Sequence, residues 1–428
     1  MHSPQEGSPL RRVVVTGIGI VSPIGNDKTE VLQSLRESRS GIESVPELRS
    51  LGLRCQVAGR VKGLDTSRIG ERPLQTMSDV AKYAAVAALE ALDDAELRHE
   101  ALRSSRVGVV IGTSAGGVNQ VTRAEALLFS GQGLAPLGTT GTVKLMASSA
   151  ALSLAAWLGV RGRCYSVSAA CASGTDSIGH AFELIRSGIL DLCLCGAAEE
   201  NICRQAGIFF DNFGGLPSSW NDCPARACRP YDRDREGMVF SEGAGVLVLE
   251  ELDRAKSRGA RIYAEVIGYG SANDGADLFE PNGQGLKRCI EEAFRAAEPS
   301  GPLHIDYVNS HAAGTKVGDP IEVRVMHEVF GPASPPVSST KGLSGHSHGA
   351  AGAHEAIFTL LMLQHNFVAP TVNLDHIAPD CEGIWHVQRQ MQLPLQTVMT
   401  FNSGFGGTNA CLIFRKLQWT RSTSRIGK

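Results

Sequence analysis

The order of the apolar segments repeats once along the 428-residue chain. Each half opens with a glycine-containing strand pattern, continues through a second strand pattern and a segment that ends in helical spacing, and closes with another apolar strand. The first half contains "VVVTGIG", "VGVVIGTSAGG", "YSVSAACASGTDSIGHAFELI" and "LCLCGAAEE", and the second contains "YAEVIGYGSAND", "IDYVNSHAAGT", "PVSSTKGLSGHSHGAAGAHEAIFTL" and "VMTFNSGFGG". The spacings differ between the halves, so the sequence indicates a structural repeat rather than a repeated sequence.

The alternation of strand and helix patterns is typical of an α/β fold whose sheets are covered on both faces. We therefore expect two similar α/β halves, residues 11–255 and 256–417, followed by a loose polar tail over residues 418–428. A cleft between two such halves would bring the polar motifs of both together.

Composition excludes several classes of function. The net charge is −3, so bulk electrostatics indicate neither a nucleic acid nor an anionic membrane as a partner. No apolar run reaches the length of a membrane span, and the N-terminal "MHSPQEGSPLRR" lacks the apolar core of a secretory signal. Eleven cysteines without paired CxxC motifs then predict reduced thiols in the cytoplasm. The segment "TGIGIVSPIG" lacks the GxGxxG spacing, which excludes a dinucleotide loop.

Cys171 stands between the β-prone run "YSVS" and a run in which apolar residues recur at helical spacing. The pattern therefore places this cysteine where a strand turns into a helix. A helix start carries partial positive charge and free N–H groups, and both favour a thiolate, so Cys171 is a candidate nucleophile. The alternative is a small buried thiol with no chemical role.

His311 ends the strand pattern of residues 304–315 in the second half. A side chain at the end of a strand is held rigidly and can still face a cleft, so His311 is a second candidate. The alternative is a histidine that satisfies backbone groups of a turn. Asp319 and Glu322 stand just before a helical periodicity, and they have an alternative role as helix caps.

The segment "SSTKGLSGHSHGAAGAHEA" contains Lys341, His346, His348, His354 and Glu355 among small residues. Three histidines so close in sequence raise the possibility of a zinc site, but the segment has neither HExxH nor paired CxxC, and we expect no metal. One or two catalytic histidines beside a lysine fit the pattern better. A lysine among small apolar residues needs a carboxylate partner, for which Glu322 is the candidate.

The segment "FNSGFGGTNA" contains Gly404, Gly406 and Gly407, which permit a tight backbone with exposed N–H groups. Such groups can form an oxyanion hole, and the alternative is an ordinary hairpin turn. One cysteine, two histidines, a lysine and a glycine-rich turn fit acyl transfer. A cysteine protease pairs its cysteine with one histidine as base, and sequence spacing does not separate these two classes.

At these motifs the chain resembles the elongating β-ketoacyl-[acyl-carrier-protein] synthases of the thiolase superfamily, over about residues 11–417. The segments that carry the resemblance are "VVVTGIGIVSPIGN", "SAACASG", "RPYDRDREGMVFSEGAGVLVLEE", "YVNSH", "SSTKGLSGHSHGAAGA" and "GFGGTNA". The resemblance implies a five-layered αβαβα fold of two thiolase halves, and a homodimer. It also implies substrates carried on the phosphopantetheine of acyl carrier protein, with no free cofactor.

The resemblance implies a reaction in which an acyl chain loaded on Cys171 is extended by two carbons from malonyl-carrier protein, with loss of CO2. His311 and His346 would then polarise the malonyl thioester and stabilise the enolate. Lys341 would orient the site and pair with Glu322. Backbone N–H groups of Cys171 and Phe405 would form the oxyanion hole, and the Phe405 ring would act as a gate.

The implied substrate-binding residues are Thr315, Met146, Phe210, Gly404 and Gly406, of which Met146 and Phe210 would be walls of the acyl tunnel. A saturated chain gains about 0.8 kcal/mol per buried CH2 in such a tunnel.

Two positions depart from the family pattern. Ala313 replaces a threonine that would hydrogen-bond the pantetheine arm, and Ser403 stands where a second phenylalanine normally packs. Both departures favour a specialised paralogue over the housekeeping enzyme.

Three alternatives remain. The first is the ketosynthase subunit of a type II polyketide or polyene pathway, as a homodimer or a heterodimer with a related subunit. The second is a non-catalytic partner that resembles a chain-length factor, although such partners lack the nucleophile. The third is a degradative thiolase, which uses a second, C-terminal cysteine; Cys411 lies in a strand pattern and matches that role poorly.

Overall fold

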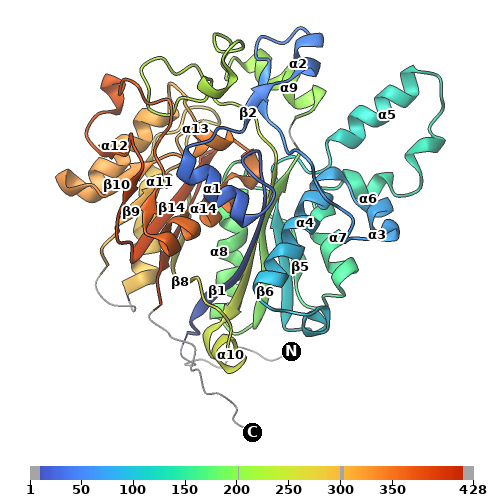
Figure 1. Cartoon of the computed structure of the whole chain (residues 1–428), viewed down its shortest axis with the longest axis horizontal. Coiled ribbons are helices and arrows are strands. Elements are labelled where there is room, and N and C mark those ends of the chain that lie inside the picture. The colour runs from blue at the N-terminus through green and yellow to red at the C-terminus, as the bar shows by residue number, and fades with distance from the viewer. Residues whose placement is uncertain (1–9, 201, 299–302, 418–428) are drawn as a thin grey trace.

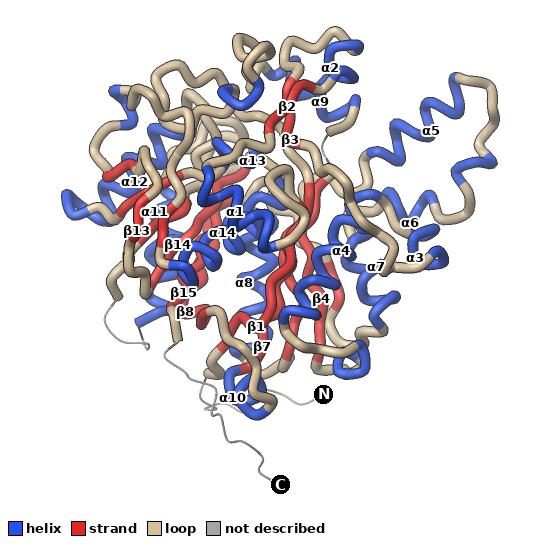
Figure 2. The backbone as a smooth tube through the Cα atoms, viewed as in Figure 1, coloured by secondary structure: helices blue, strands red, loops and turns tan. Residues whose placement is uncertain are grey.

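The computed structural model describes residues 10–200, 202–298 and 303–417 (Figures 1 and 2). Its largest sheet has eleven strands in the order β12-β10-β9-β14-β15-β8-β1-β7-β6-β4-β5. The first half of the chain supplies β1 (Val13–Val21), β4 (Val107–Gly112), β5 (Cys164–Tyr165), β6 (Leu192–Glu199) and β7 (Gly243–Glu251). The second half supplies β8 (Ala264–Asn273), β9 (Tyr307–Asn309), β10 (Pro336–Ser338), β12 (Trp385–His386), β14 (Thr397–Gly404) and β15 (Thr408–Arg415).

The two halves share one topology. The strand order β5-β4-β6-β7-β1 in the first half corresponds to β10-β9-β14-β15-β8 in the second. In each half the first three strands of this order run parallel, and the last two continue antiparallel. The structure therefore confirms the pseudo-duplicated α/β fold.

Helices on both faces of each half-sheet complete five layers. The helices α8 (Ser173–Arg186) and α14 (Ala351–His365) pack against each other and contact strands of both halves, so they form the central layer (Figure 1). The outer layers are α4 (Asp79–Asp94) with α7 (Ser149–Leu158), and α11 (Gln284–Ala297) with α12 (Gly318–Phe330). Thirteen of the fifteen residues of α14 are buried, as expected for a helix enclosed between two sheets.

The remaining elements lie around this body. The first half adds α1 (Lys28–Glu37), β2 (Ile42–Ser44), α2 (Pro46–Ser50), β3 (Val57–Gly59), α3 (Glu71–Thr76), α5 (Asn119–Phe129), α6 (Gly141–Leu145), α9 (Arg204–Phe213) and α10 (Leu252–Ser257). The second adds α13 (Lys341–Ser344), β11 (Phe367–Val368) and β13 (Met391–Gln392). The helix α5 projects away from the body in Figure 1. No helix in the described ranges combines the length and apolar character needed to cross a membrane.

The division of the chain at residue 255 stays a prediction. It falls within α10, between the last strand of the first half and β8. The expected tail over 418–428 lies outside the described residues.

Two strands are shorter than their sequence patterns predicted. The strand β5 comprises only Cys164–Tyr165, and β9 ends at Asn309. In both cases the chain leaves the sheet before the polar motif begins, so Cys171 and His311 lie in loops that follow parallel strands. Loops at the carboxyl ends of parallel strands are the usual place for a ligand site in an α/β sheet.

Candidate active site

Cys171 lies in a sharp turn two residues before α8 begins, as the sequence predicted. The preceding residue, Ala170, has a φ of 47°, a left-handed conformation that costs energy for alanine. The side chain of Ser173 holds this turn, because its hydroxyl accepts from the N–H of Ala169 at 2.9 Å and donates to the carbonyl of Ala170 at 2.6 Å. The turn therefore fixes the direction of the Cys171 thiol.

The glycine-rich hairpin between β14 and β15 packs directly on this turn. Thr408 donates a hydrogen bond to the carbonyl of Ala169 at 3.0 Å. A Cβ atom on Gly404 would lie 2.9 Å from the same carbonyl oxygen and 3.0 Å from the Cβ of Ala170. Only glycine fits this position without displacing the turn that carries Cys171.

Three groups from both halves of the chain converge at the turn. Cys171, His311 and His346 each place a sulfur or ring nitrogen within 4.8 Å of the other two. The Nε2 atom of His346 lies 3.1 Å from the sulfur of Cys171. The rings of His311 and His346 meet edge to face, with centroids 5.1 Å apart. The structure thus brings together the cysteine and both histidines that the sequence singled out.

Burial controls the protonation of these groups. It raises the pKa of the Cys171 thiol to about 12, against a lowering by the charge of Lys341. The sequence led us to expect that the helix start would favour a thiolate. A helix terminus stabilises a thiolate by only about 0.3–1 kcal/mol, whereas full burial destabilises the thiolate by several times that free energy. The resting sulfur is therefore a protonated thiol.

Both histidines are neutral in the resting site. Burial lowers the pKa of His346 well below its usual range, and His348 and Lys341 lower it further. Burial, Lys341 and His348 lower the pKa of His311 in the same way. A neutral imidazole offers one N–H donor and one lone pair, so each ring can hydrogen-bond an oxygen or exchange a proton.

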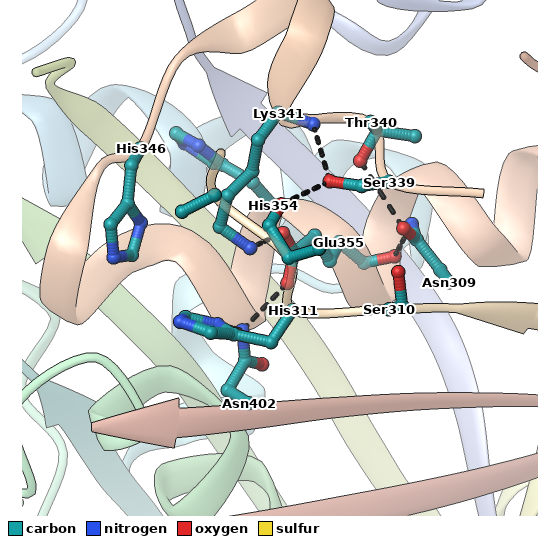
Figure 3. A network of polar contacts seen from close by, with 12 residues as sticks. Asn309, Ser310, His311, Ser339, Thr340, Lys341, His346, His354, Glu355 and Asn402 are labelled. Carbon is teal, nitrogen blue, oxygen red and sulfur yellow. Dashed lines mark hydrogen bonds and ion pairs between the residues drawn. The ribbon is translucent and has the colours of Figure 1, made fainter. Parts of the chain in front are cut away.

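Lys341 pairs with Glu355 and not with Glu322, so the expected ion pair was wrong. The Nζ atom of Lys341 contacts Oε1 of Glu355, and both side chains are at most 2% exposed (Figure 3). Glu322 lies on α12, where its Oε1 atom accepts from the hydroxyl of Tyr231 at 2.5 Å, and burial raises its pKa to about 8. Glu355 lies on α14, the next long helix along the chain after the short helix α13 that Lys341 begins.

Asn402 is a site residue that the sequence reasoning missed. Its side-chain nitrogen lies 2.7 Å from Oε2 of Glu355 and 3.0 Å from Nδ1 of His311 (Figure 3). Its oxygen contacts the hydroxyl of Thr175 on α8. A polar residue within the apolar strand pattern "VMTFNSG" is the sequence feature that could have indicated it, because a buried amide must find partners.

Comparison with known proteins identifies the family of the chain. The sequence profile of the β-ketoacyl synthase N-terminal domain matches residues 10–255, and that of the C-terminal domain matches residues 263–375. The chain belongs to the β-ketoacyl synthase family.

Two relatives match this β-ketoacyl synthase over almost its whole length. The chain is 42% identical over 409 residues to 3-oxoacyl-[acyl-carrier-protein] synthase 1 of Haemophilus influenzae, which covers 95% of this chain and 99% of the relative. It is 43% identical over 411 residues to the protein of that name from Escherichia coli, with coverages of 96% and 100%.

Solved structures of ketosynthases have the same fold. The ishigamide ketosynthase/chain length factor matches with a TM-score of 0.88 and 34% identity, over 95% of this chain and 100% of that chain. A type II polyketide synthase acyl-carrier protein in complex with its ketosynthase, bound to the hexaketide, matches with a TM-score of 0.87 and 30% identity, over 95% and 100%.

In this β-ketoacyl synthase the reactive groups lie at a cavity of about 440 Å³, lined by Cys171, His311 and His346. Four of the other predicted site residues also line it, namely Glu322, Thr315, Gly404 and Phe405. Much of the rest of the wall is apolar and includes Phe213, Leu278, Phe279, Leu286, Val317 and Ile321. The two positions that depart from the family pattern, Ala313 and Ser403, line the same cavity.

Three predicted substrate-binding residues lie outside the set of described residues that line this cavity. Gly406 is in the hairpin turn with a φ of 80°. Met146 ends α6, and its side chain is 43% exposed. Phe210 lies on α9 and stacks on the rings of His348 and Phe405, with centroids 5.0 Å and 6.1 Å away. Phe210 is therefore next to the site, and the roles of all three stay predictions.

Phe405 belongs to an aromatic cluster at the cavity. Its ring is 41% exposed and meets Phe213 and Phe279 edge to face, with centroids 5.6 Å and 5.8 Å away. The role of the Phe405 ring as a gate stays a prediction.

The histidines of the segment around His346 do not converge as zinc ligands. The Nδ1 atom of His354 lies 3.0 Å from the hydroxyl of Ser347, and its Nε2 atom lies 3.0 Å from the carbonyl oxygen of Val21. Among the described residues, the group with metal-like spacing is instead Cys171, His311 and His346.

Proposed function

We propose that this chain is a β-ketoacyl-[acyl-carrier-protein] synthase. It condenses an acyl group held as a thioester on Cys171 with malonyl-acyl carrier protein, releases CO2, and extends the chain by two carbons. The observation that carries the proposal is the convergence of Cys171, His311 and His346 on one cavity with a largely apolar wall. One thiol and two neutral imidazoles are what acyl transfer followed by enolate formation requires.

The first half-reaction is a thioester exchange. The Cys171 sulfur attacks the carbonyl carbon of the acyl-carrier thioester, and the bond to the carrier's pantetheine sulfur breaks. The thiol proton passes to the departing pantetheine thiolate, and His346 is placed to relay it because its Nε2 atom lies 3.1 Å from the sulfur. A thiol whose pKa is raised to about 12 gives up its proton only as the new bond forms, so the transfer and the attack are coupled.

The second half-reaction begins with loss of CO2 from the malonyl thioester. The electrons of the breaking C–C bond form an enolate, whose oxygen accepts hydrogen bonds from the neutral rings of His311 and His346. The enolate carbon then attacks the thioester on Cys171. Backbone N–H groups of Cys171 and Phe405 hold the tetrahedral oxyanion, and its collapse releases the β-ketoacyl product and returns the sulfur as a thiolate that takes up a proton.

Lys341 acts on these steps through its charge. Burial is the main cause of the lowered pKa of His311 and His346, and the charge of Lys341 lowers both further. The same charge opposes the rise that burial causes in the pKa of Cys171. Thr315 would contact the pantetheine arm, and Met146 and Phe210 would border the acyl chain. No free cofactor takes part, because the substrates arrive on the phosphopantetheine of the carrier.

A homodimer is the proposed assembly. The strand β5 is one of the two edge strands of the sheet, and among the described residues no strand pairs with its outer edge, where a strand of a partner could add. The adjoining segment from α5 to α6 exposes apolar side chains, namely Val121, Leu128, Phe129, Leu134, Val143 and Leu145. An exposed apolar surface of this kind is typical of a protein interface. A heterodimer with a related subunit remains the alternative, since one similar structure is a ketosynthase/chain length factor.

Acyl carrier protein is the proposed partner in both half-reactions. Carrier proteins are acidic, so we expect a basic patch at the cavity mouth. Lys316 lines the cavity and is exposed. A reducing, cytoplasmic setting fits the eleven cysteines, all of which are free thiols in the structure.

The test is intact-protein mass spectrometry after mixing the purified chain with a panel of acyl-carrier proteins. We expect a mass increase of one acyl group, absent in Cys171→Ala. Preference for saturated chains supports fatty-acid synthesis, whereas preference for polyenoyl or polyketide chains supports the type II polyketide alternative. No acylation by any donor would contradict the proposal and favour a non-catalytic partner.

A further inference from the structure

The side chain of Asn402 connects three parts of the site. It is fully buried on β14 and contacts Glu355 from α14, His311 from the loop after β9, and Thr175 from α8. These contacts give a hydrogen-bond partner to both N–H groups and to the oxygen of the Asn402 amide. Gly352 makes room for them, since a Cβ atom there would lie 2.7 Å from the amide oxygen of Asn402.

The partners of Asn402 fix which way its amide points. Oε1 of Glu355 is paired with Lys341, and Oε2 lies 2.7 Å from the Asn402 nitrogen. An ionised carboxylate only accepts hydrogen bonds, so this atom must be the NH2 group and not the carbonyl oxygen. The Thr175 hydroxyl can donate to the oxygen on the other side. A flipped amide would set two acceptors against each other at Glu355.

With this orientation, the atom that faces Nδ1 of His311 at 3.0 Å is a donor. The neutral ring of His311 must therefore accept at Nδ1 and carry its proton on Nε2. The structure holds no comparable contact for the second histidine: Nδ1 of His346 is buried without a hydrogen-bond partner among the described residues.

We propose that Asn402 is a positioning residue that sets the tautomer of His311 and so keeps an N–H donor directed into the cavity. The inference rests on the proposed function, in which this Nε2–H hydrogen-bonds the enolate oxygen during decarboxylation. Asn402 does not touch the reacting atoms. It acts through His311, and it ties that ring to the Lys341–Glu355 pair and to the helix that follows Cys171.

Asn402→Asp is the decisive variant. The new carboxylate would face that of Glu355, whose Oε2 atom lies 2.7 Å from the replaced NH2 group, so the variant is made in a Glu355→Gln background that keeps a single buried carboxylate beside Lys341. This carboxylate accepts and does not donate, so it moves the proton of His311 to Nδ1 and leaves a lone pair where the donor was. Glu355→Gln alone is the reference for each comparison. Removing an oxyanion donor or reversing a histidine tautomer costs on the order of 10²- to 10⁴-fold in rate. We expect malonyl-carrier decarboxylation to fall by about 100-fold or more, with acyl loading of Cys171 changed much less. Asn402→Ala, which leaves the ring free to take either tautomer, should give a smaller loss.

Two readouts separate this role from a merely structural one. The first is ¹⁵N NMR of histidine-labelled protein, with the His311 signals assigned by His311→Gln. We expect Nδ1 to be the unprotonated nitrogen in the native chain and the protonated one in Asn402→Asp. The second is the pH profile of decarboxylation, in which the acid limb should move to higher pH, because a carboxylate stabilises the imidazolium that the amide NH2 opposes.

The charged or titratable groups that face His311 are Lys341, His348, His346, Cys171 and, through Asn402, Glu355. Thr175→Val keeps Asn402 and frees its amide to rotate, so it should give a milder change of the same kind. Asn309→Ala is the matched control, since Asn309 is another fully buried amide and bonds Thr359, Thr340 and the backbone carbonyl of Glu355, with no contact to the His311 ring. It should leave the tautomer of His311 and the acid limb in place.

Protonated Nδ1 in the native chain, or an unchanged tautomer and acid limb in Asn402→Asp, would overturn the inference. The NMR result stands without any substrate. If the native chain decarboxylates no malonyl carrier, the proposed function fails, while the tautomer measurement still decides whether Asn402 sets the proton position.

Discussion

Lys341 and Glu355 form an ion pair that is almost completely removed from solvent, with 1% and 2% of their side chains exposed. Breaking a buried pair by removing one partner leaves an uncompensated charge and costs roughly 3–5 kcal/mol. We therefore expect Lys341→Met to lower the free energy of unfolding by about that amount, measured by urea denaturation. The double variant Lys341→Met with Glu355→Gln should recover part of the loss. Equal stability of the single and double variants would contradict this account.

The close packing of Gly404 on the turn that carries Cys171 predicts that a larger residue there will slow acyl loading. Gly404→Ala would put a methyl group 2.9 Å from the carbonyl oxygen of Ala169, and the turn must shift to admit it. We expect the rate of acyl loading on Cys171 to fall by about tenfold or more, because a misplacement of roughly 1 Å can cost 10²-fold. Single-turnover mass spectrometry measures this rate. Ser403→Ala, at the adjacent position, is the control, and a native loading rate in Gly404→Ala would refute the packing argument.

His354 predicts a dependence of stability on pH. Burial lowers its pKa to about 4, below the ordinary histidine value of about 6.5, so the unfolded chain binds the extra proton first as the pH falls. The contribution of neutral His354 to the free energy of unfolding is complete above the pKa of this histidine in the unfolded chain. It is lost as the pH falls from 6.5 towards 4. This loss amounts to about 3 kcal/mol at most.

The comparison with His354→Gln isolates that contribution, because other buried groups titrate with the opposite sign. Glu322, for example, has its pKa raised to about 8, so its protonation favours the folded chain as the pH falls. The difference in unfolding free energy between the native chain and His354→Gln should shrink between pH 7 and pH 4. A difference that stays constant over this range would show that His354 is not the group that titrates.

Ala313 predicts a change in donor binding. The residue is 4% exposed and lines the cavity, where the family pattern would place a threonine hydroxyl against the pantetheine arm. Ala313→Thr should lower the KM for the malonyl donor several-fold, since one added hydrogen bond is worth about 1 kcal/mol. Steady-state kinetics with varied malonyl-carrier concentration is the measurement. An unchanged KM would mean that the departure is neutral.

The convergence of Cys171, His311 and His346 could be predicted because their motifs combine reactive side chains with residues that shape turns. Cys171 precedes a helical periodicity, and His311 follows a strand pattern, so each could be placed in a loop at the edge of a sheet. The repeated order of segments likewise predicted two halves of one topology, and the strand order in the sheet confirms it.

The partner of Lys341 could not be predicted, because it depends on which helix face lies beside Lys341 in space. Glu322 and Glu355 are both carboxylates near helix starts, and only the packing of α14 selects the second. The pKa of Cys171 was misjudged for a related reason. The sequence shows the helix that follows the cysteine, but it does not show how many atoms surround the sulfur.

Both halves of one chain supply the residues of each site, and this determines whether two inactive variants can complement one another. Cys171 comes from the first half, and His311, Lys341 and His346 come from the second, yet all four belong to the same subunit. In the proposed homodimer, a pair of one Cys171→Ala chain and one His346→Ala chain therefore contains no intact site. Two inactive forms of this protein should not restore one another when they are produced in the same cell.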